Sequence, residues 1–214
     1  MHRRTRMMLP ALGLSGVLAL SACGGEDMDM GSMPGGSSTT SATATAGSSA
    51  PAAGEHNAAD VDFASGMIPH HAQAVEMADM AIENATNPEV KALAGRIKQA
   101  QDPEIETMSG WLTSWGEEVP EAGGGMAGMD HGGGEAMGGM MSEQDMTALG
   151  EASGSQFDRM WLEMMTAHHE GAVEMARTEL AQGSYPQAKD LAQAIIDSQS
   201  KEITEMSVLL KSLG

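Results

Sequence analysis

The feature of this sequence that most constrains its fold is an internal repeat. Residues 60–112 align with residues 158–210 without a gap, at an offset of 98 positions, and twenty of the aligned positions are identical. The identical residues include a histidine pair, methionines and glutamates, and the apolar residues between them keep the same spacing. Sequence repeats of this kind indicate repeated structural units. We therefore expect two equivalent units that carry equivalent chemistry.

Both copies have a helical pattern, because apolar residues recur at helical spacing and do not alternate with polar residues as in a β-strand. Asn87-Pro88 provides a cap and a first-turn proline for one helix, and Pro186 starts its counterpart. Residues 142–145 resemble a capping box that starts another helix. Pro103 should kink or interrupt the helix that contains it. The predicted helices span about 58–85, 88–115, 142–182 and 186–213.

The expected fold class is all-α. The first and second helices are joined by a short loop, and so are the third and fourth, so each repeat should form an antiparallel hairpin. Two homologous hairpins packed together make a four-helix bundle with pseudo-twofold symmetry. The bundle should occupy residues 58–214, as repeat one (58–116), a Gly/Met-rich connector (117–141) and repeat two (142–214).

The N-terminus predicts export. Three arginines precede a short apolar run, which is typical of a signal peptide over residues 1–22 and too short for a comfortable membrane span. Leu20-Ser21-Ala22-Cys23 also resembles the bacterial lipobox, and Cys23 is the only cysteine in the chain. We therefore expect a lipoprotein anchored through Cys23 to the extracytoplasmic face of the cell membrane; the alternative is an ordinary secretory signal. Residues 23–57, rich in Gly, Ser, Thr, Ala and Pro, are a predicted disordered tether.

The charge of the chain excludes one class of partner. Without residues 1–22, the protein has 8 Lys and Arg against 30 Asp and Glu, a net charge of about −22. Proteins that bind nucleic acids need basic surface, so no nucleic-acid partner is expected. Electrostatic docking on anionic lipid is also disfavoured, which leaves the lipid anchor as the expected membrane contact. An acidic surface attracts cations without selecting among them.

A helical projection places the paired histidines on the inward face of each hairpin. With Met67 as the reference, both histidines and the second methionine of the first repeat fall in one stripe about 120° wide, together with small residues. The second repeat reproduces this stripe. A lone histidine or methionine on such a face is usually structural, but a duplicated His-His pair with flanking thioethers favours metal binding. The candidate ligands in these stripes are His70, His71, Met67 and Met77, and His168, His169, Met165 and Met175.

Each partner helix carries a carboxylate on its apolar face. Glu104 and Glu202 follow Gln101 and Gln199 at the same spacing. A buried carboxylate without a partner costs several kcal/mol or takes up a proton. Either a histidinium or a metal ion would satisfy it, so Glu104 and Glu202 join the candidate ligands. A purely structural His–Glu and His–Asp network, with Asp60 and Asp158 as histidine partners, is the alternative.

The ligand types point to copper. Thioether sulfur favours Cu(I) and, by the same softness, Ag(I), whereas imidazole accepts Cu(I) and Cu(II). Zinc sites more often use cysteine, which the mature bundle lacks. The connector adds a second set of soft donors that resembles a metal-capture sequence, with compositional drift in a Gly-rich linker as the alternative. This secondary set is Met126, Met129, His131, Met137, Met140 and Met141.

The duplicated motif resembles a known bacterial family. Both copies carry Asp-x2-[Phe/Trp]-x3-Met-x2-His-His-x2-Ala-Val-Glu-Met-Ala, at 60–78 and 158–176, followed by Gln-x2-Glu-Ile-x2-Met at 101–108 and 199–206. This pattern is similar to the family called domain of unknown function 305, over about residues 58–212. The resemblance implies a ferritin-like four-helix bundle. Its CopM-type members are exported copper-binding proteins of copper resistance, which implies the histidine pairs and nearby methionines as ligands. Pro69 and Pro103 have no counterpart in the second copy.

The expected function is therefore copper binding, and silver binding by the same chemistry, outside the cytoplasm, for sequestration, resistance or delivery. A copper-handling partner protein or a second copy of the chain would be the expected macromolecular partner. Catalysis is not expected, because a ferritin-like oxidase needs Glu-x-x-His motifs that this sequence lacks. A metal-independent structural or signalling bundle is the remaining alternative.

Overall fold

The computed structural model describes residues 54–121 and 138–213, and these residues contain helices and no β-strand. The predicted all-α class is confirmed. The predicted signal peptide, Cys23, the predicted tether before residue 54 and most of the connector lie outside the described residues. The five helices are α1 (Ala58–Asn84), α2 (Pro88–Trp115), α3 (Glu143–Glu151), α4 (Gly154–Gln182) and α5 (Pro186–Ser212).

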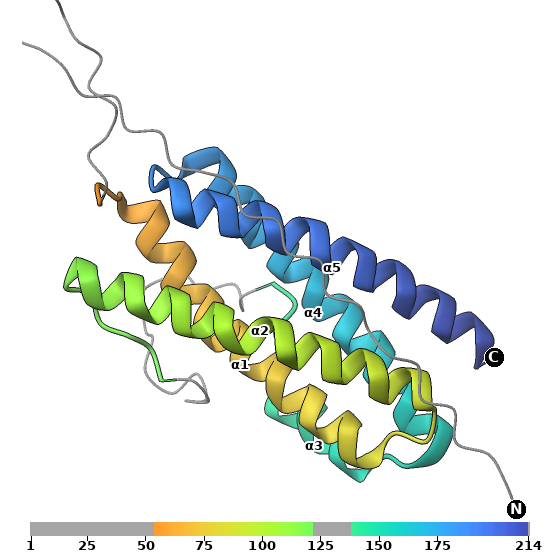
Figure 1. The fold of residues 1–214 in the computed structure, drawn as a ribbon. Coiled ribbons are helices and arrows are strands. Elements are labelled where there is room, and N and C mark those ends of the chain that lie inside the picture. The colour runs from red at the N-terminus through yellow and green to blue at the C-terminus, as the bar shows by residue number, and fades with distance from the viewer. Residues whose placement is uncertain (1–53, 122–137, 214) are drawn as a thin grey trace, which may run out of the picture. The chain divides into compact units, whose positions relative to one another are not determined.

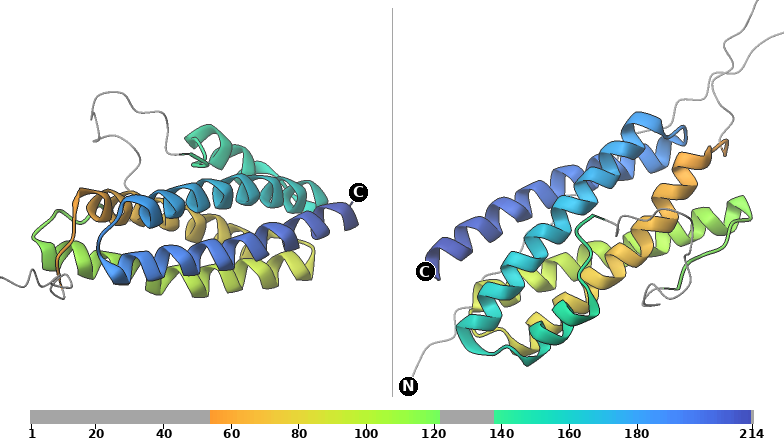
Figure 2. Two further views of the ribbon diagram at one scale, coloured as in Figure 1. Left: turned by 90° about the horizontal axis from the view of Figure 1, so that it is seen from above. Right: turned by 180° about the vertical axis from the view of Figure 1, so that it is seen from behind.

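The four long helices form two hairpins. α1 packs along α2, α4 packs along α5, and the two hairpins meet mainly through α1 and α4 (Figures 1 and 2). The N-terminal half of α1 packs on the C-terminal half of α4, so these two central helices are antiparallel. α2 and α5 lie outside them and contact each other much less. Within the described residues, no helix is long and apolar enough to cross a bilayer.

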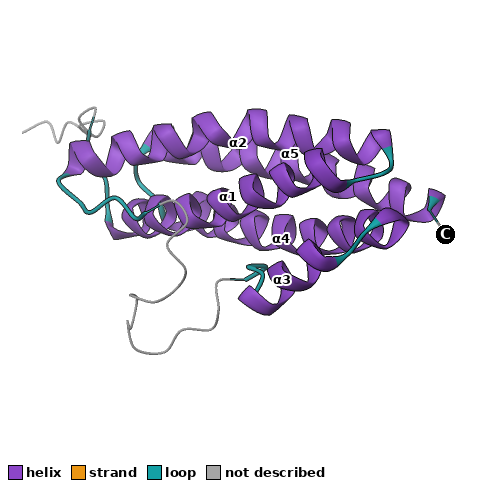
Figure 3. Ribbon diagram, turned by 90° about the horizontal axis from the view of Figure 1, so that it is seen from below, coloured by secondary structure: helices purple, strands orange, loops and turns teal. Residues whose placement is uncertain are grey.

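The helix ends follow the capping signals of the sequence. Asn57 and Asp60 form a capping box at the start of α1, and Ser142 and Asp145 form the predicted box at the start of α3. Asn87 caps α2 through the backbone N–H of Glu89. At its other end α2 stops at Gly116, whose φ of 81° lies in the left-handed region that glycine tolerates. Figure 3 shows the short loops that these caps leave between the helices.

The prediction of a single helix over 142–182 is wrong, because two helices, α3 and α4, occupy this range. Ala152 and Ser153 are extended, and Gly154 has a φ of 61°. Glycine is the residue that adopts this conformation without a steric penalty, so the chain turns here and restarts as α4. Of the kink or interruption predicted at Pro103, the interruption is wrong, because α2 is continuous from Pro88 to Trp115, and the kink stays a prediction.

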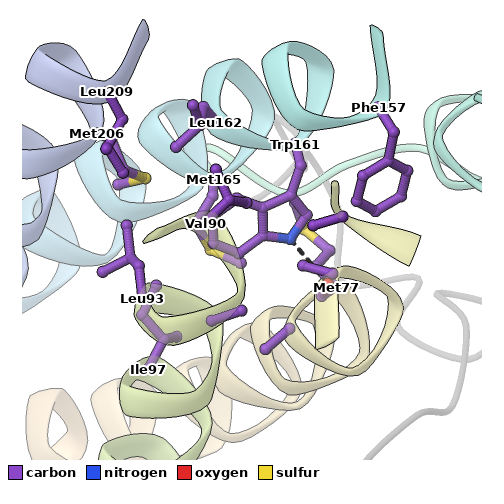
Figure 4. Close-up of a cluster of buried hydrophobic side chains, with 14 of the residues drawn as sticks. Met77, Val90, Leu93, Ile97, Phe157, Trp161, Leu162, Met165, Met206 and Leu209 are labelled. Carbon is purple, nitrogen blue, oxygen red and sulfur yellow. Dashed lines mark hydrogen bonds between the residues drawn. The ribbon is translucent and has the colours of Figure 1, made fainter. Parts of the chain in front are cut away.

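Two clusters of buried apolar side chains form the core, one toward each end of the bundle. The Trp161 cluster joins α3 to the C-terminal halves of α1 and α5 and the N-terminal halves of α2 and α4 (Figure 4). The indole Nε1 of Trp161 donates a buried hydrogen bond to the backbone oxygen of Met77, 2.8 Å away. The Phe63 cluster joins the opposite halves of the four long helices. Phe63 and Trp161 occupy equivalent repeat positions, so the core itself obeys the pseudo-twofold symmetry.

Two buried aspartates bind each hairpin to the loop of the other. Asp60 at the start of α1 accepts hydrogen bonds from the backbone N–H groups of Ser184 and Tyr185, which lie between α4 and α5. Asp158 near the start of α4 accepts from the backbone N–H groups of Thr86 and Asn87, which lie between α1 and α2. We call these contacts the reciprocal aspartate latches. The alternative in which these aspartates are the histidines' partners is therefore wrong.

Candidate metal centre

Four buried imidazoles form a polar layer between the two core clusters. His70 and His71 come from α1, His168 and His169 come from α4, and each residue is at most 1 % exposed. The rings of His70 and His168 lie against each other, with centroids 3.8 Å apart and planes tilted by 45°. The two repeats therefore bring their histidine pairs to the contact between α1 and α4. We call these four residues the histidine layer.

Each of the two outer imidazoles has a carboxylate partner from its own hairpin. The Nε2 atom of His71 lies 2.7 Å from the Oε2 atom of Glu104, and the Nε2 atom of His169 lies 2.8 Å from the Oε2 atom of Glu202. The carboxylates are partly exposed and the imidazoles are not. A carboxylate accepts hydrogen bonds, so Nε2 is the donor in both rings. Of the two expected partners of these carboxylates, a histidine or a metal ion, the structure shows the histidine contact.

Several ring nitrogens of the layer have no hydrogen-bond partner although they are buried. These atoms are the Nδ1 atoms of His70, His71 and His169 and both ring nitrogens of His168. The side-chain oxygens of Gln101 and Gln199, at the same level of the bundle, also lack partners. Buried polar atoms are normally paired, and each orphan costs free energy. A layer with this many orphans is suited to taking up a ligand.

Burial keeps the two central imidazoles neutral. Desolvation and, after it, the charge of the neighbouring His71 lower the pKa of His70 to about 3, against the opposing effect of the hydrogen bond to the Gly138 carbonyl. Desolvation also lowers the pKa of His168 well below its ordinary value, followed by the effects of His70, His169 and His71. A neutral imidazole has one lone pair on a ring nitrogen, and this is the form that binds metals. His70 and His168 are thus in the ligating form at neutral pH.

The predicted methionine ligands are divided between the two sides of the layer. Met77 and Met165 are buried in the Trp161 cluster, whereas Met67 is buried in the Phe63 cluster and Met175 packs against that cluster. Each side of the layer thus receives one thioether from each repeat. Met67 and Met165 also lie one helical turn before the histidines of their own helices, on the same face.

The end of the connector lies over the His70–His168 pair. The carbonyl oxygen of Gly138 is 3.3 Å from the Nε2 atom of His70. The backbone N–H of Met141 donates to the side-chain oxygen of Gln73 at 2.7 Å, and the backbone oxygen of Met141 accepts from the side-chain N–H of Gln73 at 2.9 Å. Met140 and Met141 are partly buried. The other predicted capture residues, Met126, Met129, His131 and Met137, lie outside the described residues.

The donor set fits a soft or borderline metal better than a hard one. Across residues 54–121 and 138–213, no three side chains among His, Cys, Asp and Glu converge to hold an ion. The layer instead offers the imidazole nitrogens of four histidines, with thioethers on both sides. In His70, His71 and His169 the other ring nitrogen is held by a carbonyl or a carboxylate. A ligating histidine usually donates its second N–H to such a group, which orients the ring. Copper and silver suit this set by ligand softness.

Fold and site together define a helical bundle built from two hairpins around a buried histidine layer. The chain belongs to the family described as Domain of unknown function (DUF305), whose model matches residues 60–210. The predicted family is confirmed. A search of curated proteins finds no match.

Two similar proteins of known structure support this assignment. A Streptomyces coelicolor DUF305 protein, named as secreted, is 35 % identical with a TM-score of 0.64, over 73 % of this chain and 92 % of its own. CopM in its Cu(I)-bound form is 34 % identical with a TM-score of 0.58, over 72 % of this chain and 96 % of its own. CopM in its Cu(II)-bound form is 36 % identical with a TM-score of 0.62, over 72 % and 97 %. CopM has also been solved with silver.

The sequence analysis missed the residues that seat the connector on the layer. Gln73 binds Met141, and its repeat equivalent is Gly171, where a side chain would collide with the backbone of Gly138. Both positions lie beside identical residues of the two copies and differ from each other. The difference between these two positions, on helix faces that are otherwise alike in the two repeats, was the available sequence signal.

Proposed function

We propose that this protein binds copper, and silver by the same chemistry, in the histidine layer, and that it sequesters or delivers the metal outside the cytoplasm. The observation that carries the proposal is the set of buried ring nitrogens without partners, contributed by both repeats. CopM, about one-third identical over nearly its whole length, has been solved with Cu(I), with Cu(II) and with silver. The chemistry of this chain's own donors supports the same cargo.

The four histidines are the proposed principal ligands. Nδ1 of His71 and His169 is free because Nε2 of each ring binds a carboxylate. Glu104 and Glu202 then act as positioning residues, which fix the ring orientation and balance the charge of a bound cation. Met67, Met77, Met165 and Met175 supply thioethers from both sides of the layer, which favours the reduced metal.

The decisive experiment is an anaerobic Cu(I) titration and an aerobic Cu(II) titration of the full chain, with metal analysis after gel filtration. The wild-type protein should retain copper, and its melting temperature should rise with metal, because a ligand that binds only the folded state stabilises it. Replacement of all four layer histidines by alanine should abolish tight binding. His56→Ala is the matched control, since His56 stacks on Trp115 outside the layer.

Failure of the wild-type protein to retain copper, with an unchanged melting temperature, would overturn the proposal. Loss of binding in the His56→Ala control as well would show that the layer is not the site. The His–Glu hydrogen bonds favour one competing function, a metal-independent structural or signalling bundle. A partner protein captured equally well by apo wild-type and four-alanine chains would support that competitor.

We further propose that Cys23 is lipidated and tethers the bundle to the outer face of the cell membrane. The lipobox-like residues before it support this proposal. Cys23→Ser should move the protein from the membrane fraction to the soluble exported fraction and abolish incorporation of labelled fatty acid. Unchanged fractionation of Cys23→Ser would refute the tether and leave the copper proposal intact.

The proposed role is binding rather than catalysis, because the histidines and the facing glutamates lie on different helices without a Glu-x-x-His motif.

A further inference from the structure

Residues 138–141, which we call the connector strap, cross from α4 to α1 directly over the central histidine pair. At α4 the strap touches the backbone: a side chain at Gly139 would clash with the carbonyl of Ala167 and with His168. At α1 the strap reaches His70 through the Gly138 carbonyl, 3.3 Å from Nε2. It therefore touches the helix segments that carry both imidazoles of the stacked pair.

The contact between strap and bundle is specific at three places. Gln73 forms two hydrogen bonds with the backbone of Met141, at 2.7 and 2.9 Å. Gly171 has no side chain, and a Cβ atom there would collide with the carbonyl of Gly138. Gly139 has a φ of 87°, a conformation that glycine adopts readily and other residues rarely do. These features hold the strap in one position.

The strap is single, whereas the layer beneath it is symmetric. Gln73 and Gly171 are equivalent positions of the two repeats, so one helix binds the strap through a side chain and the other makes room for it. As a result His70 has a hydrogen-bond partner at Nε2, whereas His168 has none at either ring nitrogen. The strap thus distinguishes two rings that the repeat makes equivalent.

We propose that the connector strap is the gate of the histidine pair: metal and other reagents reach His70 and His168 only when residues 138–141 lift off α1 and α4. Both rings are at most 1 % exposed, so some part of the structure must move before either can meet an ion. The strap is held by a few hydrogen bonds, by close backbone contact and by the partly buried apolar side chain of Met141, whereas many fully buried apolar side chains hold the helices beneath it. Local opening selects the element with the fewest buried apolar contacts. Metal exchange through the gate rests on the proposed function, but gating of histidine access does not.

A metal-independent test uses diethyl pyrocarbonate, which modifies accessible neutral imidazoles, on the full apo chain with peptide mapping. Gln73→Ala removes both hydrogen bonds to Met141, each worth a few-fold in an opening equilibrium, so His70 and His168 should react roughly tenfold to thirtyfold faster. Gly171→Ala should accelerate the same two residues by displacing Gly138. Gly95→Ala is the matched control, because Gly95 is also inside a helix but has open space around its Cβ position.

Modification of His70 and His168 at the wild-type rate in both strap variants would overturn the proposal. Equal acceleration of all four layer histidines would also overturn it, because that result indicates general loosening of the bundle. Glu104→Gln tests the competing route between α2 and α5, where the partly exposed carboxylates lie. If this variant, and not the strap variants, exposes the central pair, the gate lies there instead.

The metal-dependent test follows the release of Cu(I) from the loaded protein to a competing chelator. Gln73→Ala and Gly171→Ala should release Cu(I) at least tenfold faster than the wild type, and Gly95→Ala should not. Unchanged release from strap variants whose apo histidines have become reactive would show that the metal takes another path. A wild-type protein that holds no Cu(I) would refute the proposed function, while the modification test would still decide whether the strap covers the histidines.

Discussion

Glu179 should make the folded protein less stable as the pH rises, and Glu179→Gln should remove that dependence. The side chain of Glu179, on α4, is 1 % exposed, and neither carboxyl oxygen has a hydrogen bond of good geometry. Gly183 makes room for it, since a side chain at that position would collide with the carboxyl group. Burial, followed by the hydrogen bond and the charge of Asp60, raises the pKa of Glu179 to about 8.

The sign of the effect follows from proton binding. Above pH 4.5 an unfolded chain releases the Glu179 proton, whereas the folded protein keeps it up to about pH 8. The folded state therefore binds more protons, and its stability falls as the pH rises through this window. Asp60 behaves oppositely. Burial raises its pKa, but the hydrogen bonds with Asn57, Tyr185, Glu179 and Ser184 together lower it below its ordinary value, so Asp60 stays ionised throughout this window.

The magnitude can be worked from the same values. Each pH unit over which Glu179 is ionised in the unfolded chain but not in the folded protein costs roughly 1.4 kcal/mol of folding free energy. Between pH 5 and pH 8 the cost should grow by on the order of 3 kcal/mol. Below pH 4.5 both states are protonated and the cost disappears. Glutamine keeps the size of the side chain and does not ionise, so the variant should lack this slope.

Urea unfolding of wild type and Glu179→Gln at pH 5, 6, 7 and 8 provides the measurement. The difference in free energy of unfolding between the two proteins should widen with pH, and the variant should be the more stable protein at pH 8. Glu163→Gln is the matched control, because Glu163 is exposed on the same helix and its loss changes the net charge equally. Parallel pH curves for wild type and Glu179→Gln would refute the reasoning.

Three further predictions concern the latches, the core and the layer. Asp158→Asn leaves one acceptor oxygen for three donors of the α1–α2 loop and should lower the free energy of unfolding by about 2 kcal/mol, measured in urea. Trp161→Phe removes the donor of the buried bond to Met77 and should cost roughly 1–3 kcal/mol in the same assay, with a destabilisation near zero counting against that bond. Glu202→Gln should weaken copper binding about tenfold to a hundredfold through the orientation of His169, without changing metal stoichiometry; unchanged affinity in a competition titration would remove the carboxylate from the site.

The sequence predicted the architecture well because the repeat carries it. Apolar spacing placed the helix ends within a residue or two wherever a proline or a capping residue marked them, as at Asn87 and Pro186. The break between α3 and α4 was missed, because a glycine with positive φ is not distinguishable in sequence from a glycine inside a helix. Pro103 does not interrupt α2, because the packing of α2 along α1 outweighs the loss of one backbone hydrogen bond.

The candidate site was predicted in part. Helical phase placed the histidines inside and the facing glutamates opposite them, and the structure shows both His–Glu contacts. Periodicity along one helix carries no information on which loops a neighbouring hairpin presents. The alternative that paired Asp60 and Asp158 with histidines was therefore wrong, since both bind loop backbone. The same limit hid the connector strap, whose position depends on contacts between residues about 70 positions apart.

The reciprocal aspartate latches make each hairpin depend on the other. Asp60 binds a loop that belongs to the other hairpin, and Asp158 returns the contact. The aspartate of a single hairpin would therefore have no loop to bind within that hairpin, and the stacked rings of His70 and His168 also come one from each hairpin. The bundle thus has the arrangement of a homodimer whose two subunits are linked in one chain, and its repeats differ at positions such as Gln73 and Gly171.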